Sequence, residues 1–188
     1  NPTGAALNDA SATGTILNDD RWFVWQVQGS GPCSPVIVPC VLNANTGFVT
    51  LPVRAAIVTA IGPDGFAMQT PDAESDNDPT TSDGIWVFTF AGAAPQTDSG
   101  ETIAVGDRVE VTGGVKEFFG FTEVQVNTTR NASNSIVRLA QGQALPTAVE
   151  FSLAAGVPSA DPDALSCPGS GLGGAAGSDT NFECFESM

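Results

Sequence analysis

Five carboxylate side chains gather in a polar segment that lies between two apolar, β-prone runs. Four of them alternate along the chain and the fifth follows shortly afterwards: Asp72, Glu74, Asp76, Asp78 and Asp83. No basic residue lies among them, and like charges at this spacing repel unless water or a cation screens them. Alternating carboxylate oxygens suit Ca²⁺, so the segment is a candidate calcium site, although it lacks the central glycine and closing glutamate of an EF-hand. The alternative is a hydrated acidic surface loop.

The composition removes the commonest catalytic groups. The 188 residues include no histidine and no tyrosine, and Lys116 is the only lysine. Histidine is the usual general base and a frequent metal ligand, and no other motif indicates acid–base or nucleophilic catalysis. We therefore predict that this chain is not an enzyme.

The charge balance is strongly acidic, with 6 basic residues against 21 acidic ones and a formal net charge of −15. Such a charge favours solubility and opposes long-range attraction to nucleic acid or anionic lipid. No apolar run approaches the ~20 residues of a membrane-spanning helix, so we expect no membrane insertion. The chain opens at Asn1 without a signal-type apolar core, which we interpret as a mature or excised piece of a longer precursor.

Four cysteines fall into two local pairs, Cys33 with Cys40 and Cys167 with Cys184. Each pair brackets a loop-like segment, which favours local pairing among the three possible connectivities. Four free thiols are the alternative. Two disulfides indicate an oxidising compartment, so we predict an extracellular or cell-surface location.

Runs rich in β-branched and aromatic residues, separated by turn residues, fill the middle of the chain. The expected strands cover residues 21–27, 48–61, 66–69, 85–90, 108–119, 121–126 and 135–139, and residues 149–153 are one more strand or the start of a short helix. Pro52, inside the longest run, predicts a bulge or a sheet edge. Five or six core strands with short turns and one long insertion predict an all-β fold, a five- to six-stranded OB-like barrel.

The same pattern divides the chain into four parts. Residues 1–20 form an extension with an orphan β-strand at residues 12–17, and residues 21–46 hold a lead-in strand and the Cys33/Cys40 loop. Residues 47–154 form the barrel, and residues 155–188 form a Gly- and Pro-rich tail stapled by the second cysteine pair. Because a lone strand leaves its backbone groups unpaired, residues 12–17 must pair within this molecule or with a neighbour.

Several motifs resemble the OB-like domain of large secreted bacterial nucleases, which carry an endonuclease/exonuclease/phosphatase catalytic domain further along. The matching stretches, in order, are Gln28–Gly31, Gly65–Gln69 leading into Asp76–Ile85, Val105–Gly113 and Glu117–Glu123. Ala12–Asp20 resembles the last strand of a Calx-β repeat, and Phe182–Met188 resembles a junction to a following domain. The resemblance implies an accessory module whose catalytic domain is not in this chain.

A predicted hairpin carries a second group of candidate ligand-binding residues: Lys116, Phe118, Phe119 and Phe121. Exposed aromatic rings beside a basic residue on an OB barrel can stack on bases or sugars. We favour the alternative that at least two of these rings fill the barrel, because alternate positions on a barrel strand point inward. We likewise expect the three tryptophans, Trp22, Trp25 and Trp86, in the core. Asn127 and Asn131 begin glycosylation sequons on a predicted loop, although sequons also arise by chance.

Two functions follow. The first is a non-catalytic extracellular module of a secreted nuclease-like protein, which binds or positions extracellular DNA or polysaccharide, weakly or through Ca²⁺. The second is a self-assembling structural subunit of an extracellular filament or matrix, in which residues 12–17 add to the sheet of the next copy, head to tail.

Overall fold

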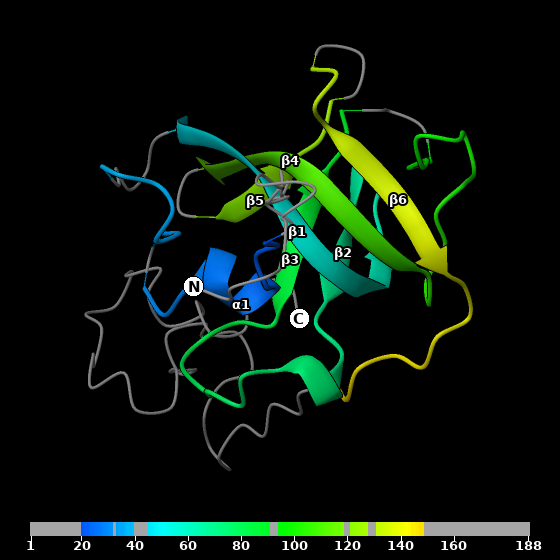
Figure 1. The fold of residues 1–188 in the computed structure, drawn as a ribbon, viewed down its shortest axis with the longest axis horizontal. Coiled ribbons are helices and arrows are strands. Elements are labelled where there is room, and N and C mark those ends of the chain that lie inside the picture. The colour runs from blue at the N-terminus through cyan, green and yellow to red at the C-terminus, as the bar shows by residue number, and fades with distance from the viewer. Residues whose placement is uncertain are drawn as a thin grey trace, which may run out of the picture.

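The computed structural model describes residues 20–31, 33–39, 45–90, 94–118, 121–127 and 131–148 (Figure 1). Its elements in chain order are α1 (Val24–Gln28), β1 (Asn45–Ile61), β2 (Gly65–Gln69), a 3₁₀ turn (Asp72–Glu74), β3 (Gly84–Phe88), β4 (Arg108–Phe118), β5 (Thr122–Gln125) and β6 (Ser135–Ala140). The predicted strands from residue 48 to residue 139 are thus present, with ends within a few residues of those expected.

Five strands close into a barrel. They follow the order β1-β2-β3-β5-β4, and β4 pairs back onto β1. The β3–β5 pair is parallel and the other pairs are antiparallel, while β6 adds to β4 outside the closed ring. This mixed five-stranded barrel with one extra strand confirms the predicted all-β, OB-like fold.

The long strand β1 closes the barrel because it serves two neighbours. It pairs with β4 over most of its length and with β2 near its end, and its register against β4 shifts between Thr46 and Val49 and again between Val53 and Ala56. Such bulges bend and twist a strand, which lets one strand pass from one side of a barrel to the other.

A single apolar cluster fills the barrel, and it draws on every strand and on α1. Val24 and Val27, three positions apart in α1, are 1% and 0% exposed and point the helix at the core. The predicted strand at residues 21–27 is therefore wrong. The side-chain oxygen of Gln26 accepts the Phe23 N–H at 3.0 Å at the start of the helix, and Gly29 ends it with a positive φ of 73°. Burial of one helical face outweighs the β-propensity of the segment.

Candidate binding groove

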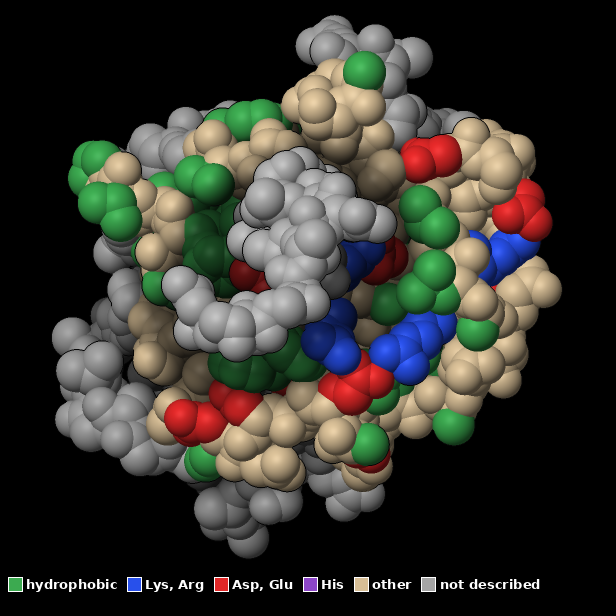
Figure 2. Space-filling view, viewed as in Figure 1, with side chains coloured by type: hydrophobic (Ala, Val, Ile, Leu, Met, Phe, Trp, Pro, Cys, Tyr) green, Lys and Arg blue, Asp and Glu red, His purple; other side chains and the backbone are tan. Residues whose placement is uncertain are grey.

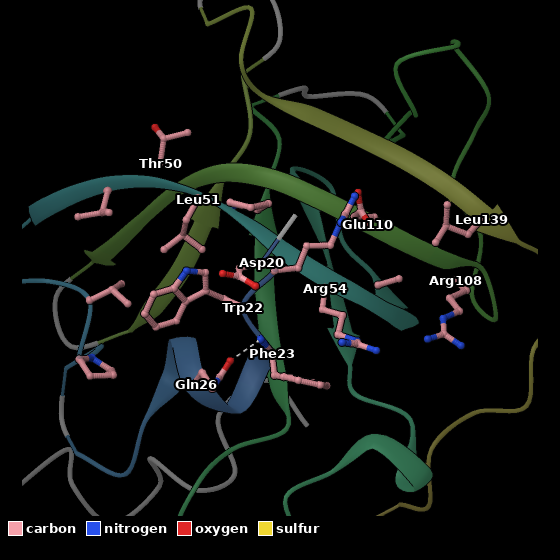
Figure 3. A pocket seen from close by; sticks show the side chains of 16 residues that line it. Asp20, Trp22, Phe23, Gln26, Thr50, Leu51, Arg54, Arg108, Glu110 and Leu139 are labelled. Atoms are coloured by element: carbon pink, nitrogen blue, oxygen red, sulfur yellow. Dashed lines mark hydrogen bonds and ion pairs between the residues drawn. The ribbon is translucent and has the colours of Figure 1, made fainter. Parts of the chain in front are cut away.

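An open groove of about 1510 Å³ lies between the α1 segment and the outer side of β1 and β4 (Figure 3). Its two ends differ in chemistry. The apolar half is lined by Trp22, Pro35, Val36, Val49 and Leu51, and the charged half by Arg21, Phe23, Arg54, Arg108 and Glu110. Large, partly apolar hollows with a few convergent polar groups are the usual places for ligands.

Backbone pairing fixes one wall of the groove. The N–H of Trp22 donates to the carbonyl of Pro52 at 3.0 Å, and the N–H of Arg54 donates to the carbonyl of Trp22 at 2.8 Å. These bonds form a parallel bridge between Trp22 and Val53. They hold the Trp22 side chain, which is 40% exposed, at the centre of the groove instead of in the core, contrary to our expectation for this tryptophan. Trp25 and Trp86 are only partly buried.

The charged half contains a stack of one guanidinium and two rings. The guanidinium of Arg54 lies 4.5 Å from the centre of the Phe23 ring, and the rings of Phe23 and Trp25 stack at 5.1 Å. A guanidinium over an aromatic face is held by the ring quadrupole. The stack therefore orients Arg54 while its side chain stays 49% exposed.

Carboxylates balance the arginines of this half. Glu74 bridges two of them, at 2.6 Å from Nη2 of Arg108 and 3.5 Å from Nε of Arg54, and Glu110 pairs with Nε of Arg21 at 2.5 Å. Figure 2 shows the resulting mixture of basic and acidic side chains over β1 and β4. Three of the six basic residues of the chain thus meet in one groove, each beside a carboxylate.

The predicted calcium ligands engage protein groups instead of one shared centre. Glu74 faces the arginines, and Asp72 accepts the backbone N–H of Thr147 at 3.0 Å and its hydroxyl at 2.5 Å. The other three bond within the loop: Asp76 with Thr81, Asp78 with Thr80, and Asp83 with Ser75. Among the described residues, no three carboxylates lie close enough together to hold a metal ion. Calcium binding by this loop stays a prediction.

The hydrogen bonds and the burial of these carboxyl groups shift their pKa values in opposite directions. The Thr147 hydroxyl and backbone N–H lower the pKa of Asp72, and the corresponding groups of Thr80 lower the pKa of Asp78. Burial raises the pKa of Asp83, against the opposing hydrogen bond from Ser75. Asp72 and Asp78 therefore ionise at a lower pH than Asp83.

The described hairpin residues do not line the groove. Phe118 is 45% exposed and Phe121 is partly buried, and neither belongs to the core cluster. Phe119 lies outside the described residues. Because neither Phe118 nor Phe121 fills the barrel, the expectation that at least two of the three hairpin rings do so is wrong. Lys116 pairs across the sheet with Glu123. These side chains stay separate from the groove at β1.

Two further predictions concern covalent modification. Cys33 is disulfide-bonded, and Cys40, Cys167 and Cys184 all lie outside the described residues, so the local pairing stays a prediction. Of the two sequon asparagines, Asn131 accepts the Ser133 N–H at 3.0 Å within an exposed turn, and Asn127 is partly buried. Neither observation tests glycosylation.

Comparison with known proteins adds no relative: no protein-family model, no curated protein and no solved structure matches this chain. No helix in the described part of the chain is long and apolar enough to cross a membrane. The fold and the groove therefore carry the functional argument.

Sequence reasoning missed the groove because its residues come from segments that lie far apart in the sequence. Arg21 and Trp22 precede α1, Arg54 lies on β1 and Arg108 lies on β4. One signal was present in the sequence. In a chain with so few basic residues, an arginine directly before Trp-Phe and an arginine inside each long β-run are conspicuous.

Proposed function

We propose that this chain is a non-catalytic, extracellular OB-like module of a secreted nuclease-like protein, and that the charged half of its groove holds a single-stranded segment of nucleic acid. The observation that carries the proposal is the convergence of Arg21, Arg54 and Arg108 beside aromatic rings in a chain of net charge −15. Proteins that hold single strands combine a basic track with rings on which bases stack.

The geometry of the groove supports a flexible ligand. Arg54 is preoriented by the Phe23 ring, and its guanidinium plane is the group that best matches a phosphate. Trp22 exposes its ring at the centre of the groove. A strand that crosses the charged half would thus meet phosphate-binding and stacking groups within one hollow.

The carboxylates of the groove set the strength of such binding. Glu74 and Glu110 already pair with the three arginines, and the overall charge repels a polyanion. We expect weak binding that depends steeply on salt, with a slope of about −2 in a plot of log K against log salt for about three phosphate contacts.

Fluorescence anisotropy with a labelled oligothymidylate at low salt tests the proposal. Arg54→Gln should weaken binding several-fold and reduce the salt slope by about 1. Lys116→Gln removes the same unit charge at the hairpin and should leave binding unchanged. Absence of binding by the unaltered chain at low salt, or an equal loss in the two variants, overturns the proposal. Retention of a neutral polysaccharide instead of the oligonucleotide would reassign the ligand to sugars.

A further inference from the structure

Among the described residues, no strand lies beside one edge of β1 where it passes the apolar half of the groove. On one side, β1 pairs with β4 from Asn45 to Ile57, and on the other side β2 reaches only Ile57–Ile61. Within the described part of the chain, the remaining edge is contacted by the backbone at one point, the bridge between Trp22 and Val53. Unpaired strand edges are templates for an incoming strand.

The direction of the free backbone groups follows from the bonds to Trp22. The Pro52 carbonyl and the Arg54 N–H both point to this edge, because both bond to Trp22. The register against β4 is unbroken from Val49 to Val53, so Thr50, two positions before Pro52, presents its N–H and carbonyl to the same edge. Pro52 has no N–H to lose there, which explains why the strand tolerates a proline.

The groove beside this edge is apolar and shaped by a helical segment on its far side. Val49 and Thr50 are exposed, and Trp22, Val36 and Leu51 line the same groove (Figure 3). A strand edge facing apolar side chains is the geometry in which proteins accept an extended peptide by β-augmentation. The required occupant is a segment that alternates small polar and apolar residues.

This chain carries such a segment directly before the groove. Residues 12–17, Ala-Thr-Gly-Thr-Ile-Leu, precede the first described residue, Asp20, which lies at the groove itself. The parallel bridge of Trp22 with Val53 sets the register for this chain's own backbone. Continued upstream, it would place Asp20 opposite Leu51 and Asn18 opposite Val49, so that polar residues would enter the apolar half.

We propose that the free edge of β1 accepts residues 12–17 of a second copy of this chain, which places the face of that strand that carries Ile16 in the apolar half. Each copy then has one donor strand and one acceptor edge. A head-to-tail contact of this kind builds a linear assembly where its rotation does not close a ring. The proposal rests on the backbone edge of β1 and the apolar half, and it uses none of the three arginines of the charged half.

Light scattering on the full chain, two disabling variants and one control variant tests the proposal. Thr50→Pro removes the N–H at the acceptor edge and leaves the side that bonds to β4 intact, while Thr50→Ala retains the N–H as a control. Thr15→Pro removes a backbone N–H from the donor segment and leaves the sequence of the barrel unchanged. The unaltered chain and T50A should show an average mass that grows with protein concentration, and T50P and T15P should each remain at the mass of one chain.

Mixing T50P with T15P distinguishes strand exchange between copies from a strand that folds back onto its own barrel. T50P keeps its donor and T15P keeps its acceptor, so an equimolar mixture should form a capped dimer. Added salt should increase the assembly of the unaltered chain, because it screens repulsion between acidic copies, whereas it should weaken binding of an oligonucleotide. A chain that stays monomeric at all concentrations, variants that assemble like the unaltered chain, or a mixture without dimers overturns the proposal. If T50P does not fold, the T15P variant still tests the proposal. Assembly of T15P like that of the unaltered chain would show that residues 12–17 are not the donor strand.

Discussion

The carboxylate of Glu117 accepts a hydrogen bond from the backbone N–H of Ser34 at 2.6 Å, across 83 positions of sequence. The same oxygen accepts the hydroxyl of Thr122 at 2.7 Å, and the Ser34 hydroxyl donates to the carbonyl of Val27. Glu117 is 1% exposed. A buried charge on β4 thus fastens the segment that follows α1, next to Cys33, onto the barrel.

Replacement of Glu117 by alanine should destabilise the protein by about 2–3 kcal/mol, because it leaves the buried Ser34 N–H and the Thr122 hydroxyl without their acceptor. Glu117→Gln retains an oxygen for Ser34 and should lose less. Urea unfolding gives the free energies of unfolding. Glu101→Ala, at an exposed carboxylate, should change stability by no more than about 1 kcal/mol. A loss from E117A no greater than that from E101A would show that the buried carboxylate does not fasten the segment.

A second prediction concerns the balance of charge in the groove. Glu74→Gln removes the carboxylate shared by Arg54 and Arg108 and frees both guanidinium groups for phosphate. Oligonucleotide binding should become several-fold tighter, with a steeper dependence on salt. Glu101→Gln makes the same change in net charge beside Arg138, away from the groove, and should have a small effect. The measurement is anisotropy over a series of salt concentrations; equal gains for E74Q and E101Q would point to net charge and not to the groove.

The barrel was predictable from sequence because its strands alternate in hydrophobicity and are separated by turn residues. The segment from Trp22 to Gln28 was not, since its aromatic and β-branched residues favour a strand and only burial of Val24 and Val27 makes it a helix. The residues that pair with the acidic loop could not be predicted from the sequence either. Glu74 meets Arg108 34 positions away, a proximity that follows from closure of the barrel and not from local spacing.

The first residue of β2, Gly65, packs too closely on β3 to carry a side chain. A Cβ built on Gly65 would lie 2.1 Å from the carbonyl oxygen of Val87 and 3.0 Å from the Trp86 ring. Gly65→Ala should therefore destabilise the barrel by about 1–3 kcal/mol, because a backbone atom of β3 must move. Gly31→Ala is the matched control, since nothing lies within 4 Å of its Cβ position. Thermal melts of both variants compare the two sites, and a melting temperature for G65A equal to that of G31A contradicts the prediction.

The stability of the protein should depend on pH through the buried carboxyl group of Glu123 on β5. Burial raises the pKa of Glu123, against the opposing effects of the Gln125 side chain and Lys116. The folded state therefore holds this proton more tightly than the unfolded chain. Its contribution to stability is full below the ordinary pKa of 4.5 and is lost as the pH rises through the higher folded value.

Glu123→Gln removes this titration, so the free energy of unfolding of the unaltered chain should fall relative to that of E123Q as the pH rises above 4.5. For Asp78→Asn we expect a pH dependence of the free energy of unfolding with the opposite sign. The hydrogen bonds from Thr80 lower the pKa of Asp78, so its contribution is present above its ordinary pKa of 3.8 and is lost as the pH falls below it. Urea unfolding at a series of pH values measures both differences. Parallel profiles for E123Q and the unaltered chain above pH 4.5 would mean that Glu123 ionises as readily in the barrel as in water.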